Sequence, residues 1–384
     1  MDTRARLLAA GWFVGAVALA LTGCDSGPSP TSESSLSTPG AATGGVTSRP
    51  TGDPRPIDGR LDRVVFLDKD VAYASWVLTP PAAGVGGPLA WATTRTRDGW
   101  EHSRRLGRSD LLGRATPLLS SDGSVASWSE RPFQLTLVDL AGRRQVVGVA
   151  RSVRPAPRSA ILVGSGWQIS GLPSGLWWWR PGSRMAYAVP ASPHLGLNRT
   201  VAVVAASGRI WVQGWGPGQS VWLAWTDDGG AHWREHRVAR RGYPGGILVS
   251  ADVVGVPAWR SHGDVPVAAD MVSVDGGATW QPWQAHGLPA RTWSEGDVGG
   301  PAGAYATPEG RAMVVDVASQ RLLVAEPGSW DRFDPAPGVG RVSWVMGNGD
   351  LVWAGGAEDE DPRGPHLIQV SDDGGRTWDN VRVG

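Results

Sequence analysis

The residues of this 384-residue chain whose types could do chemistry are arginines, carboxylates and a tyrosine in expected loops. Glu295 and Asp297 lie two positions apart, and paired carboxylates can supply the acid and base of a hydrolysis. Arginine binds carboxylates through two parallel hydrogen bonds, which favours capture of an acidic ligand. Simple solvation of charged loops is the competing interpretation. The candidate ligand face comprises Arg154, Arg199, Arg241, Tyr243, Arg260, His262, Arg291, Glu295 and Asp297.

Other reactive motifs are missing from the sequence. The seven histidines show no HExxH spacing, and a single cysteine excludes a cysteine-rich zinc site. No Walker loop, dinucleotide fingerprint or Gly-x-Ser-x-Gly elbow is present, so we expect no cofactor and no metal. The acidic run 358–361 offers oxygen ligands for a cation such as Ca²⁺, or is a solvated loop tip. The 36 basic and 36 acidic residues cancel, so no net field favours nucleic acid or an anionic membrane.

The N-terminus has the pattern of an export signal. Arg4 and Arg6 precede an apolar run, residues 7–21, that is too short for a comfortable membrane span. It ends in Leu-Thr-Gly-Cys, which resembles a bacterial lipobox, and Cys24 is the only cysteine. We predict a lipoprotein signal peptide over 1–23 and an extracytoplasmic protein anchored to the membrane by lipid on Cys24. An ordinary signal peptide with an incidental cysteine is the alternative.

The next segment, residues 24–59, predicts a disordered tether. It is rich in Ser, Thr, Pro and Gly and has few large apolar groups, so it cannot bury enough surface to offset its ordering entropy. Its expected role is to hold the following domain away from the lipid surface.

An eight-residue segment of the form S/T-x-D-x-G-x-x-W is the strongest pattern in the chain. Its three copies end at Trp233, Trp280 and Trp378, and the first two lie 47 residues apart. A fixed period of this size indicates a repeated supersecondary unit. The Asp can accept hydrogen bonds from its own turn, the Gly supplies a positive φ and the Trp packs on the hairpin, so we expect structural roles. The twelve residues are Thr226, Asp228, Gly230, Trp233, Ser273, Asp275, Gly277, Trp280, Ser371, Asp373, Gly375 and Trp378.

The same step locates four weaker units, anchored at Trp100, Gln145, Tyr187 and Trp330. Short alternating apolar runs separated by Gly, Asp, Asn and Pro indicate strands throughout residues 60–384. We predict an all-β, seven-bladed β-propeller with four antiparallel strands in each blade. Six or eight blades would mean that the anchors at Gln145 or Tyr187 are misplaced, and a β-sandwich array is the competing architecture. The first unit starts with its first strand, so the ring should close without a swapped strand.

These segments resemble the Asp-box (BNR) repeats of sialidases and related secreted propellers, over residues 60–384. The resemblance to sialidases implies an arginine triad, a Tyr–Glu nucleophile pair and an Asp acid/base. The early Phe/Tyr-Arg-Ile-Pro motif of sialidases is absent, and the nearest segment, 152–155, lacks the aromatic residue. No catalytic residue is therefore carried over. Seven Asp-box blades also occur in photosystem-assembly-factor-like propellers, which bind protein partners without catalysis.

The repeat pattern also indicates where a site would lie. In each unit the box turn and the turn between the first two strands should line one face, and the longer, more varied loops should line the other. Variable loops on one face of a repeat array usually carry the binding residues. We therefore expect a non-catalytic module that binds a protein or glycan on its loop face; a sialidase-like or other glycoside hydrolase is the alternative.

Overall fold

The structure is a computed structural model in which the described residues form an all-β ring. The described residues are 18–19, 59–78, 90–100, 103–105, 118–119, 125–130, 133–138, 143–164, 176–195, 200–206, 208–244, 246–262, 265–268, 270–288, 303–316, 319–328, 330–356 and 366–383. Apart from the Ala18–Leu19 pair, the expected signal peptide, Cys24 and all but the last residue of the tether lie outside them. None of the described helices is long and apolar enough to cross a membrane.

Within the described residues the strands form six blades. Blade 1 contains β2 (Gly59–Phe66), β3 (Ala72–Leu78), β4 (Ala90–Thr96) and β5 (Ser103–Arg105). Blade 2 contains β6 (Leu118–Leu119), β7 (Val125–Glu130), β8 (Phe133–Val138), β9 (Arg144–Val153), β10 (Ile161–Gly164), β11 (Leu176–Trp179) and β12 (Met185–Ala188). Blade 3 contains β13 (Thr200–Ala206), β14 (Arg209–Trp215), β15 (Val221–Thr226) and β16 (Arg234–Ala239), with the 3-10 helix η2 (Pro217–Gln219) between β14 and β15.

The remaining blades complete the chain. Blade 4 contains β17 (Gly242–Pro244), β18 (Leu248–Ser250), β19 (Val253–Val256), β20 (Ala258–His262), β21 (Val265–Ala268), β22 (Met271–Ser273) and β23 (Gln281–Pro282). Blade 5 contains β24 (Ala304–Ala306), β25 (Ala312–Asp316), β26 (Arg321–Ala325) and β27 (Asp334–Pro335). Blade 6 contains β28 (Trp344–Asn348), β29 (Leu351–Gly355), β30 (His366–Ser371) and β31 (Asp379–Val383).

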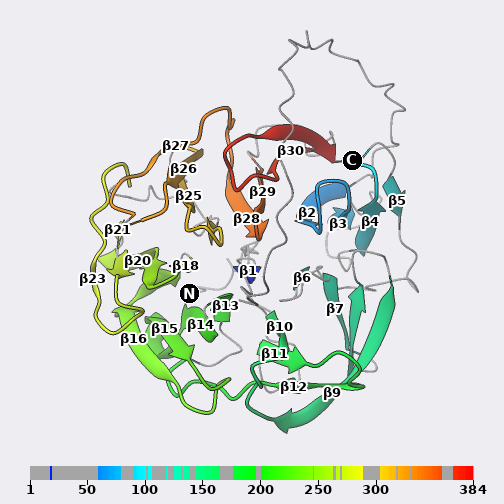
Figure 1. Cartoon of the computed structure of the whole chain (residues 1–384), viewed down its shortest axis with the longest axis horizontal. Coiled ribbons are helices and arrows are strands. Elements are labelled where there is room, and N and C mark those ends of the chain that lie inside the picture. The colour runs from blue at the N-terminus through cyan, green and yellow to red at the C-terminus, as the bar shows by residue number, and fades with distance from the viewer. Residues whose placement is uncertain are drawn as a thin grey trace, which may run out of the picture.

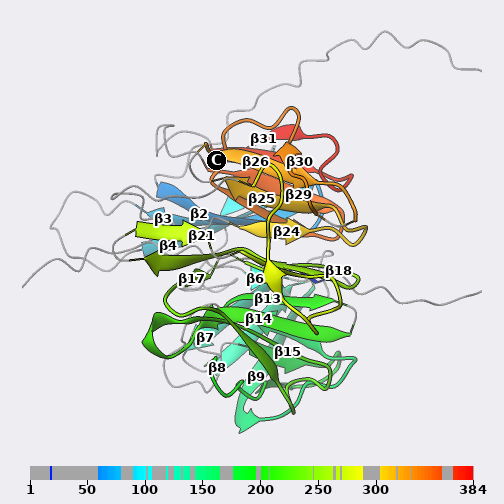
Figure 2. The same ribbon diagram turned by 90° about the vertical axis from the view of Figure 1, so that its left-hand side faces the viewer.

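The blades are arranged radially (Figure 1). Strands such as β13, β18 and β28 lie nearer the centre, whereas β16, β23 and β27 lie at the outside. Seen from the edge of the ring, β13, β14 and β15 run across its thickness (Figure 2). The short strand β1 (Ala18–Leu19) pairs in parallel with β13. Together these features confirm the predicted all-β propeller.

Buried apolar side chains gather where blades meet. One core cluster joins Trp211 and Trp225 of blade 3 to Val254 of blade 4. Others join blades 4 and 5 and blades 5 and 6 in the same way. A blade exposes two sheet faces, and each face is removed from water only by the neighbouring blade. The ring therefore gains its hydrophobic stabilisation at the junctions.

The prediction of seven separate four-stranded blades is wrong. Strands β6 to β12 form one seven-stranded sheet because β12 pairs in parallel with β9, which merges the two units anchored at Gln145 and Tyr187. The segments that end at Gln145 and Tyr187 lack the Ser or Thr and the Asp at the box positions. They therefore lack the side chains that form the hydrogen-bonded turn of a complete box. Instead Gln145 Nε2 donates to Ser183 O at 3.3 Å, and Met185 lies against Gly148, where a Cβ would be 2.9 Å from its Sδ.

Blade 4 also departs from the uniform pattern of four strands. Its hydrogen-bonded ladders are divided into two sheets, β17-β20-β21 and β18-β19-β22-β23. Only Pro257 separates β19 from β20. Proline has no N–H to donate to a ladder, so it interrupts the pairing without ending the blade.

The ring closes where blade 6 meets blade 1. Trp353 Nε1 donates to Val64 O at 3.2 Å, and the Trp353 ring packs against Phe66 with centroids 5.6 Å apart. The strands of both blades are paired in sequence order, from β2 to β5 and from β28 to β31. The described strands therefore close the ring by packing of whole blades, as predicted, rather than by exchange of a strand.

Candidate functional site

Only part of the candidate ligand face falls on described residues. Arg199, Arg291, Glu295 and Asp297 lie outside them, as does the acidic run 358–361. Arg154 and Arg241 are exposed and belong to different blades. The structure therefore does not bring these two arginines together in one site.

Tyr243, Arg260 and His262 were predicted to lie in loops, and that prediction is wrong. Tyr243 is in β17, where it pairs with Trp259, and the other two residues are in β20. The β20–β21 pairing continues as far as His262 and Val265. Apolar residues on both sides of this hairpin extend the ladder beyond the boundary expected from the sequence.

The three other tyrosines are held in the framework of the ring. Tyr73 is buried in blade 1. Tyr305 is buried in blade 5 and donates its hydroxyl to Gly349 O at 2.6 Å. Burial raises the pKa of the Tyr305 phenol well above its usual range, and the nearby Asp350 adds to the effect. Tyr187 is half-buried between Trp178, 5.0 Å away between centroids, and the guanidinium of Arg154, 4.5 Å from its ring.

The S/T-x-D-x-G-x-x-W segments form one hydrogen-bonded turn in three blades, which we call the box turn. In the first, Thr226 Oγ1 donates to Asp228 Oδ1 at 2.8 Å and accepts from Gly230 N at 2.9 Å. Ser273 and Ser371 make the same two contacts in the other copies, at 2.7 Å each. The aspartate also accepts from the backbone N–H four positions later in all three turns. These contacts use the aspartate as an acceptor within its own turn.

The same hydrogen bonds hold the box aspartates in their charged form. The side-chain and backbone hydrogen bonds from Thr279 lower the pKa of Asp275 to about 2, with a further contribution from Ser273. For Asp228, the backbone N–H and side chain of His232 lower the pKa well below its usual range. A carboxylate with such a low pKa is a poor general acid or base near neutral pH.

Two tryptophans occupy a different position in the turn from the one predicted. Trp100 N donates to Thr96 Oγ1 at 2.9 Å, which is the contact made by Gly230 N in the complete box turn. Trp100 therefore stands at the box glycine and adopts a positive φ of 72°. Trp330 likewise has a φ of 53°, and Phe333 directly precedes β27 as the box tryptophan precedes its strand. In an incomplete box, a Trp four residues after the first box position therefore indicates that the Trp replaces the box glycine, rather than occupying the position of the box tryptophan.

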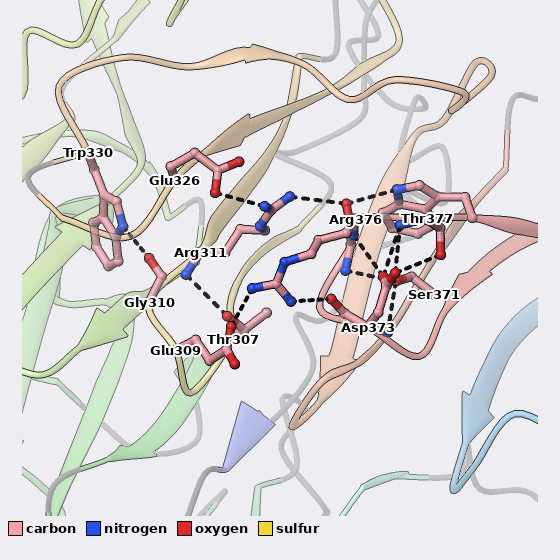
Figure 3. Close-up of polar contacts among 12 residues, drawn as sticks. Thr307, Glu309, Gly310, Arg311, Glu326, Trp330, Ser371, Asp373, Arg376 and Thr377 are labelled. Carbon is pink, nitrogen blue, oxygen red and sulfur yellow. Dashed lines mark hydrogen bonds and ion pairs between the residues drawn. The ribbon is translucent and has the colours of Figure 1, made fainter. Parts of the chain in front are cut away.

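Arginines connect the box turns of neighbouring blades. Arg311, at the start of β25, donates to Gly375 O in the box turn of blade 6 at 3.4 Å and pairs with Glu326 at 2.7 Å (Figure 3). Arg376 of that same turn pairs with Glu309 of blade 5 at 2.5 Å. This end of the ring is therefore cross-linked by charge-assisted hydrogen bonds, and its charged groups serve the junction.

A second loop region, on blade 3, has properties suited to ligand contact. The connection between β14 and β15 exposes Pro217–Gln219, in which Gln219 adopts a left-handed φ of 62°. Arg241 Nε donates to Gln219 Oε1 at 3.4 Å, and Trp215 Nε1 donates to Gly242 O at 3.0 Å. A strained residue that persists in an exposed loop is fixed by its surroundings, and such residues concentrate at functional sites.

An aromatic pair continues this region. The His194 ring stacks on Trp222 with centroids 4.5 Å apart and planes 2° apart. Glu235 accepts from His194 N at 2.9 Å and contacts His194 Nδ1 at 2.5 Å. Desolvation works against ionisation of Glu235, but the His194 hydrogen bonds outweigh it and lower the pKa of the carboxyl. The side chain of His194 is 55% exposed, whereas that of Glu235 is 12% exposed, so an exposed histidine is held by a largely covered carboxylate.

We call the group formed by His194, Pro217–Gln219, Trp222 and Arg241 the blade 3 loop surface. Trp222 connects its two halves, because Trp222 Nε1 donates to Ser220 Oγ at 2.8 Å. A Cβ at Gly216 would lie 2.5 Å from Trp222 Cδ1, so the close approach requires glycine there. Sequence reasoning identified Arg241 but missed His194 and Trp222, since nothing in their local sequence indicates that residues 28 positions apart stack.

The described residues contain no group of three or more His, Cys, Asp or Glu side chains placed to hold a metal ion. The blade 3 loop surface instead offers a flat aromatic face, amide groups and one guanidinium. Such a set can stack on a ring or a planar group and donate hydrogen bonds to acceptor oxygens.

No protein-family model and no curated protein match the chain. Among solved structures it is similar to U3-55K, with a TM-score of 0.51 and 11% identity over 83% of this chain and 97% of that one. It is also similar to a Mycobacterium tuberculosis puromycin-hydrolyzing peptidase, with a TM-score of 0.51 and 15% identity over 87% of this chain and 54% of that one. YCF48 bound to D1 peptide aligns with a TM-score of 0.32 and 13% identity over 85% and 82% of the two chains. At these identities the similarity shows a β-propeller fold and nothing finer.

Proposed function

We propose that this protein is a lipid-anchored, extracytoplasmic β-propeller that binds a protein or glycan partner without catalysis. The lipobox-like segment ending at Cys24 supports export and anchoring, and the Ser/Thr/Pro/Gly-rich segment supports a spacer. The blade 3 loop surface is the observation that carries the binding role. It holds an exposed His194 flat on Trp222, and Arg241 donates to Gln219 in the adjoining connection between β14 and β15.

The box carboxylates, Tyr305 and Glu235 form hydrogen bonds within the fold, which supports a binding role over a catalytic one. The box carboxylates accept hydrogen bonds from their own turns, and Tyr305 donates its hydroxyl to a backbone carbonyl. The Glu235 carboxylate accepts a hydrogen bond from His194 N and contacts His194 Nδ1. A hydrolase needs an acid, a base and substrate-gripping groups that converge on one reacting bond, with protonation states that can change near the working pH.

Partner binding is tested with the full chain carrying Cys24→Ser, which removes the lipid. Two measurements are made on this chain: binding to a glycan array and chemical cross-linking to envelope proteins. Both are repeated with the chain that also carries His194→Ala and Arg241→Ala. We expect the double variant to lose about tenfold or more in affinity, since aromatic and arginine anchors dominate interfaces. A control with Arg321→Ala and Arg382→Ala, two exposed arginines on blades 5 and 6, should bind normally. Equal binding by all three forms would contradict the assignment.

A sialidase-like hydrolase is the alternative, and the three box turns are the feature that favours it. Turnover of a fluorogenic sialoside by the Cys24→Ser chain would establish it. The non-catalytic proposal predicts a rate indistinguishable from buffer.

A further inference from the structure

The zero net charge of the chain conceals a strongly basic sector. Residues 140–226 contain nine arginines and neither an aspartate nor a glutamate. The acidic residues that balance them lie elsewhere in the sequence. A local excess of one sign produces a surface potential whatever the total charge is.

The fold concentrates this charge on one part of the ring. Six of the arginines lie on or directly beside β9, β12 or the neighbouring strand β11, and all six are exposed: Arg143, Arg144, Arg151, Arg154, Arg180 and Arg184. The parallel pairing places Arg184 beside Gly148, whose N–H donates to Arg184 O at 2.9 Å. Figure 1 shows β9 and β12 side by side at the rim of the ring. The basic residues thus share the outer edge of blade 2.

Exposed apolar side chains accompany the arginines. Val146 is 45% exposed, Val153 46% and Met185 36%, and these are three of the five large apolar side chains that are exposed among the described residues. Val146 and Gly148 lie on the same face of β9, and Met185 lies over that glycine, whereas Val153 is exposed at the end of the strand. The edge of blade 2 is therefore both cationic and apolar.

We propose that β9 and β12 form a docking face for an anionic lipid bilayer. The arginines would lie against lipid phosphates, and Val146 and Met185 would enter the boundary between headgroups and acyl chains. Basic residues near an anionic membrane each strengthen binding about fivefold, and a single weak attachment gains stability from a second signal. Docking would orient the ring with the edge of blade 2 toward the membrane. It requires no partner on the blade 3 loop surface.

The apolar side chains decide between a membrane and a soluble polyanion. A polyanion such as an acidic polysaccharide or a nucleic acid is held by charge, with strong dependence on salt. Exposed valine and methionine contribute nothing to such contacts, but they contribute at a lipid interface. Mixed cationic and apolar composition therefore favours the bilayer.

The test is vesicle flotation with the full chain carrying Cys24→Ser, so that no acyl chain is present. Vesicles of phosphatidylcholine with about 30 to 40 mol% phosphatidylglycerol, which have a negative surface potential, are compared with vesicles of pure phosphatidylcholine. We expect binding to the anionic vesicles, reduced about tenfold or more by Arg151→Gln with Arg184→Gln. Arg321→Gln with Arg382→Gln removes the same charge from blades 5 and 6 and should leave binding unchanged. The N-terminal apolar run is common to all forms, so its own insertion would not separate the two pairs.

A third variant distinguishes binding to an anionic bilayer from binding to a soluble polyanion. Val146→Ser with Met185→Ser should weaken vesicle binding several-fold while leaving retention on heparin resin unchanged. Circular dichroism of each variant confirms the fold before flotation. Equal loss of binding in the two arginine pairs, or retention by heparin without flotation, would each overturn the proposal.

Discussion

Arg209 Nη1 donates a 2.7 Å hydrogen bond to the carbonyl oxygen of Gly276, across the junction between blades 3 and 4. Arg311 makes the corresponding contact to Gly375 between blades 5 and 6. Each arginine stands at the start of the second inner strand of its blade and also pairs with a carboxylate of that blade, Asp227 or Glu326. The repeat therefore encodes an inter-blade contact as well as the turn itself.

Removing Arg209 should weaken the junction. Arg209→Met abolishes the bond to Gly276 and the pair with Asp227, and we expect a loss of about 1–3 kcal/mol in the free energy of unfolding. Arg234→Met is the control, since that side chain is 65% exposed and its nitrogen lies 3.9 Å from Asp227. It should change stability by less than about 0.5 kcal/mol. Urea denaturation measures both; equal losses would show that the inter-blade bond has no stabilising effect.

The box glycine is predicted to be required for packing as well as for its backbone conformation. Gly277 has a φ of 88°, and a Cβ there would lie 2.8 Å from Trp211 Cη2 in blade 3. Gly208 has a similar φ of 77° but no atom within 4 Å. Gly277→Ala should therefore destabilise by about 1–3 kcal/mol more than Gly208→Ala. Thermal unfolding of the two variants checks this, and identical melting temperatures would mean that only the backbone matters.

Asp275 should give the protein an acid-sensitive contribution to stability. Its pKa is about 2 in the folded protein, mainly because of hydrogen bonds from Thr279, and about 3.9 in an unfolded chain. The folded state therefore favours the carboxylate, so the contribution is present above about pH 4 and is lost as the pH falls toward 2. Asp275→Asn should flatten this part of the stability profile, and Thr279→Val should flatten it partly. Denaturation curves between pH 2 and 5 that are parallel for all three forms would refute the linkage.

The seam between blades 6 and 1 offers a matched pair of tryptophans. Trp353 Nε1 donates to Val64 O at 3.2 Å, whereas the buried Nε1 of Trp211 has no hydrogen-bond partner among the described residues. Both substitutions to Phe remove similar volume, so Trp353→Phe should cost about 1 kcal/mol more than Trp211→Phe. Chemical denaturation of the two variants measures the difference; a larger loss for Trp211→Phe would argue against a hydrogen-bonded seam.

The sequence predicted the propeller and the box turns because both are local. The hydroxyl, aspartate and glycine of each box lie within five residues, and they form the same turn whichever blade carries them. The merging of Gln145 and Tyr187 into one sheet could not be predicted, because it depends on parallel pairing between strands about 35 residues apart. A period detects repeated units, but it does not determine which edges pair.

The loop site was predicted less well for a related reason. Arg241 was identified by residue type, whereas the stacking of His194 on Trp222 depends on the path of the chain between blades 2 and 3. Tyr243 and Arg260 were expected in loops, but cross-strand pairing between β17 and β20 places both in strands. Tertiary pairing overrides local propensity most readily at strand ends.

Site-specific photo-crosslinking in cells tests directly whether the blade 3 loop surface binds a partner. A photoreactive phenylalanine analogue replaces Gln219 at the exposed tip of that surface, or Arg321 on blade 5 as a matched exposed control. We expect a discrete crosslinked species from position 219 that disappears when His194→Ala and Arg241→Ala are added, and none from position 321. A crosslinking pattern that is the same at both positions, or that is unaffected by the double substitution, would contradict it.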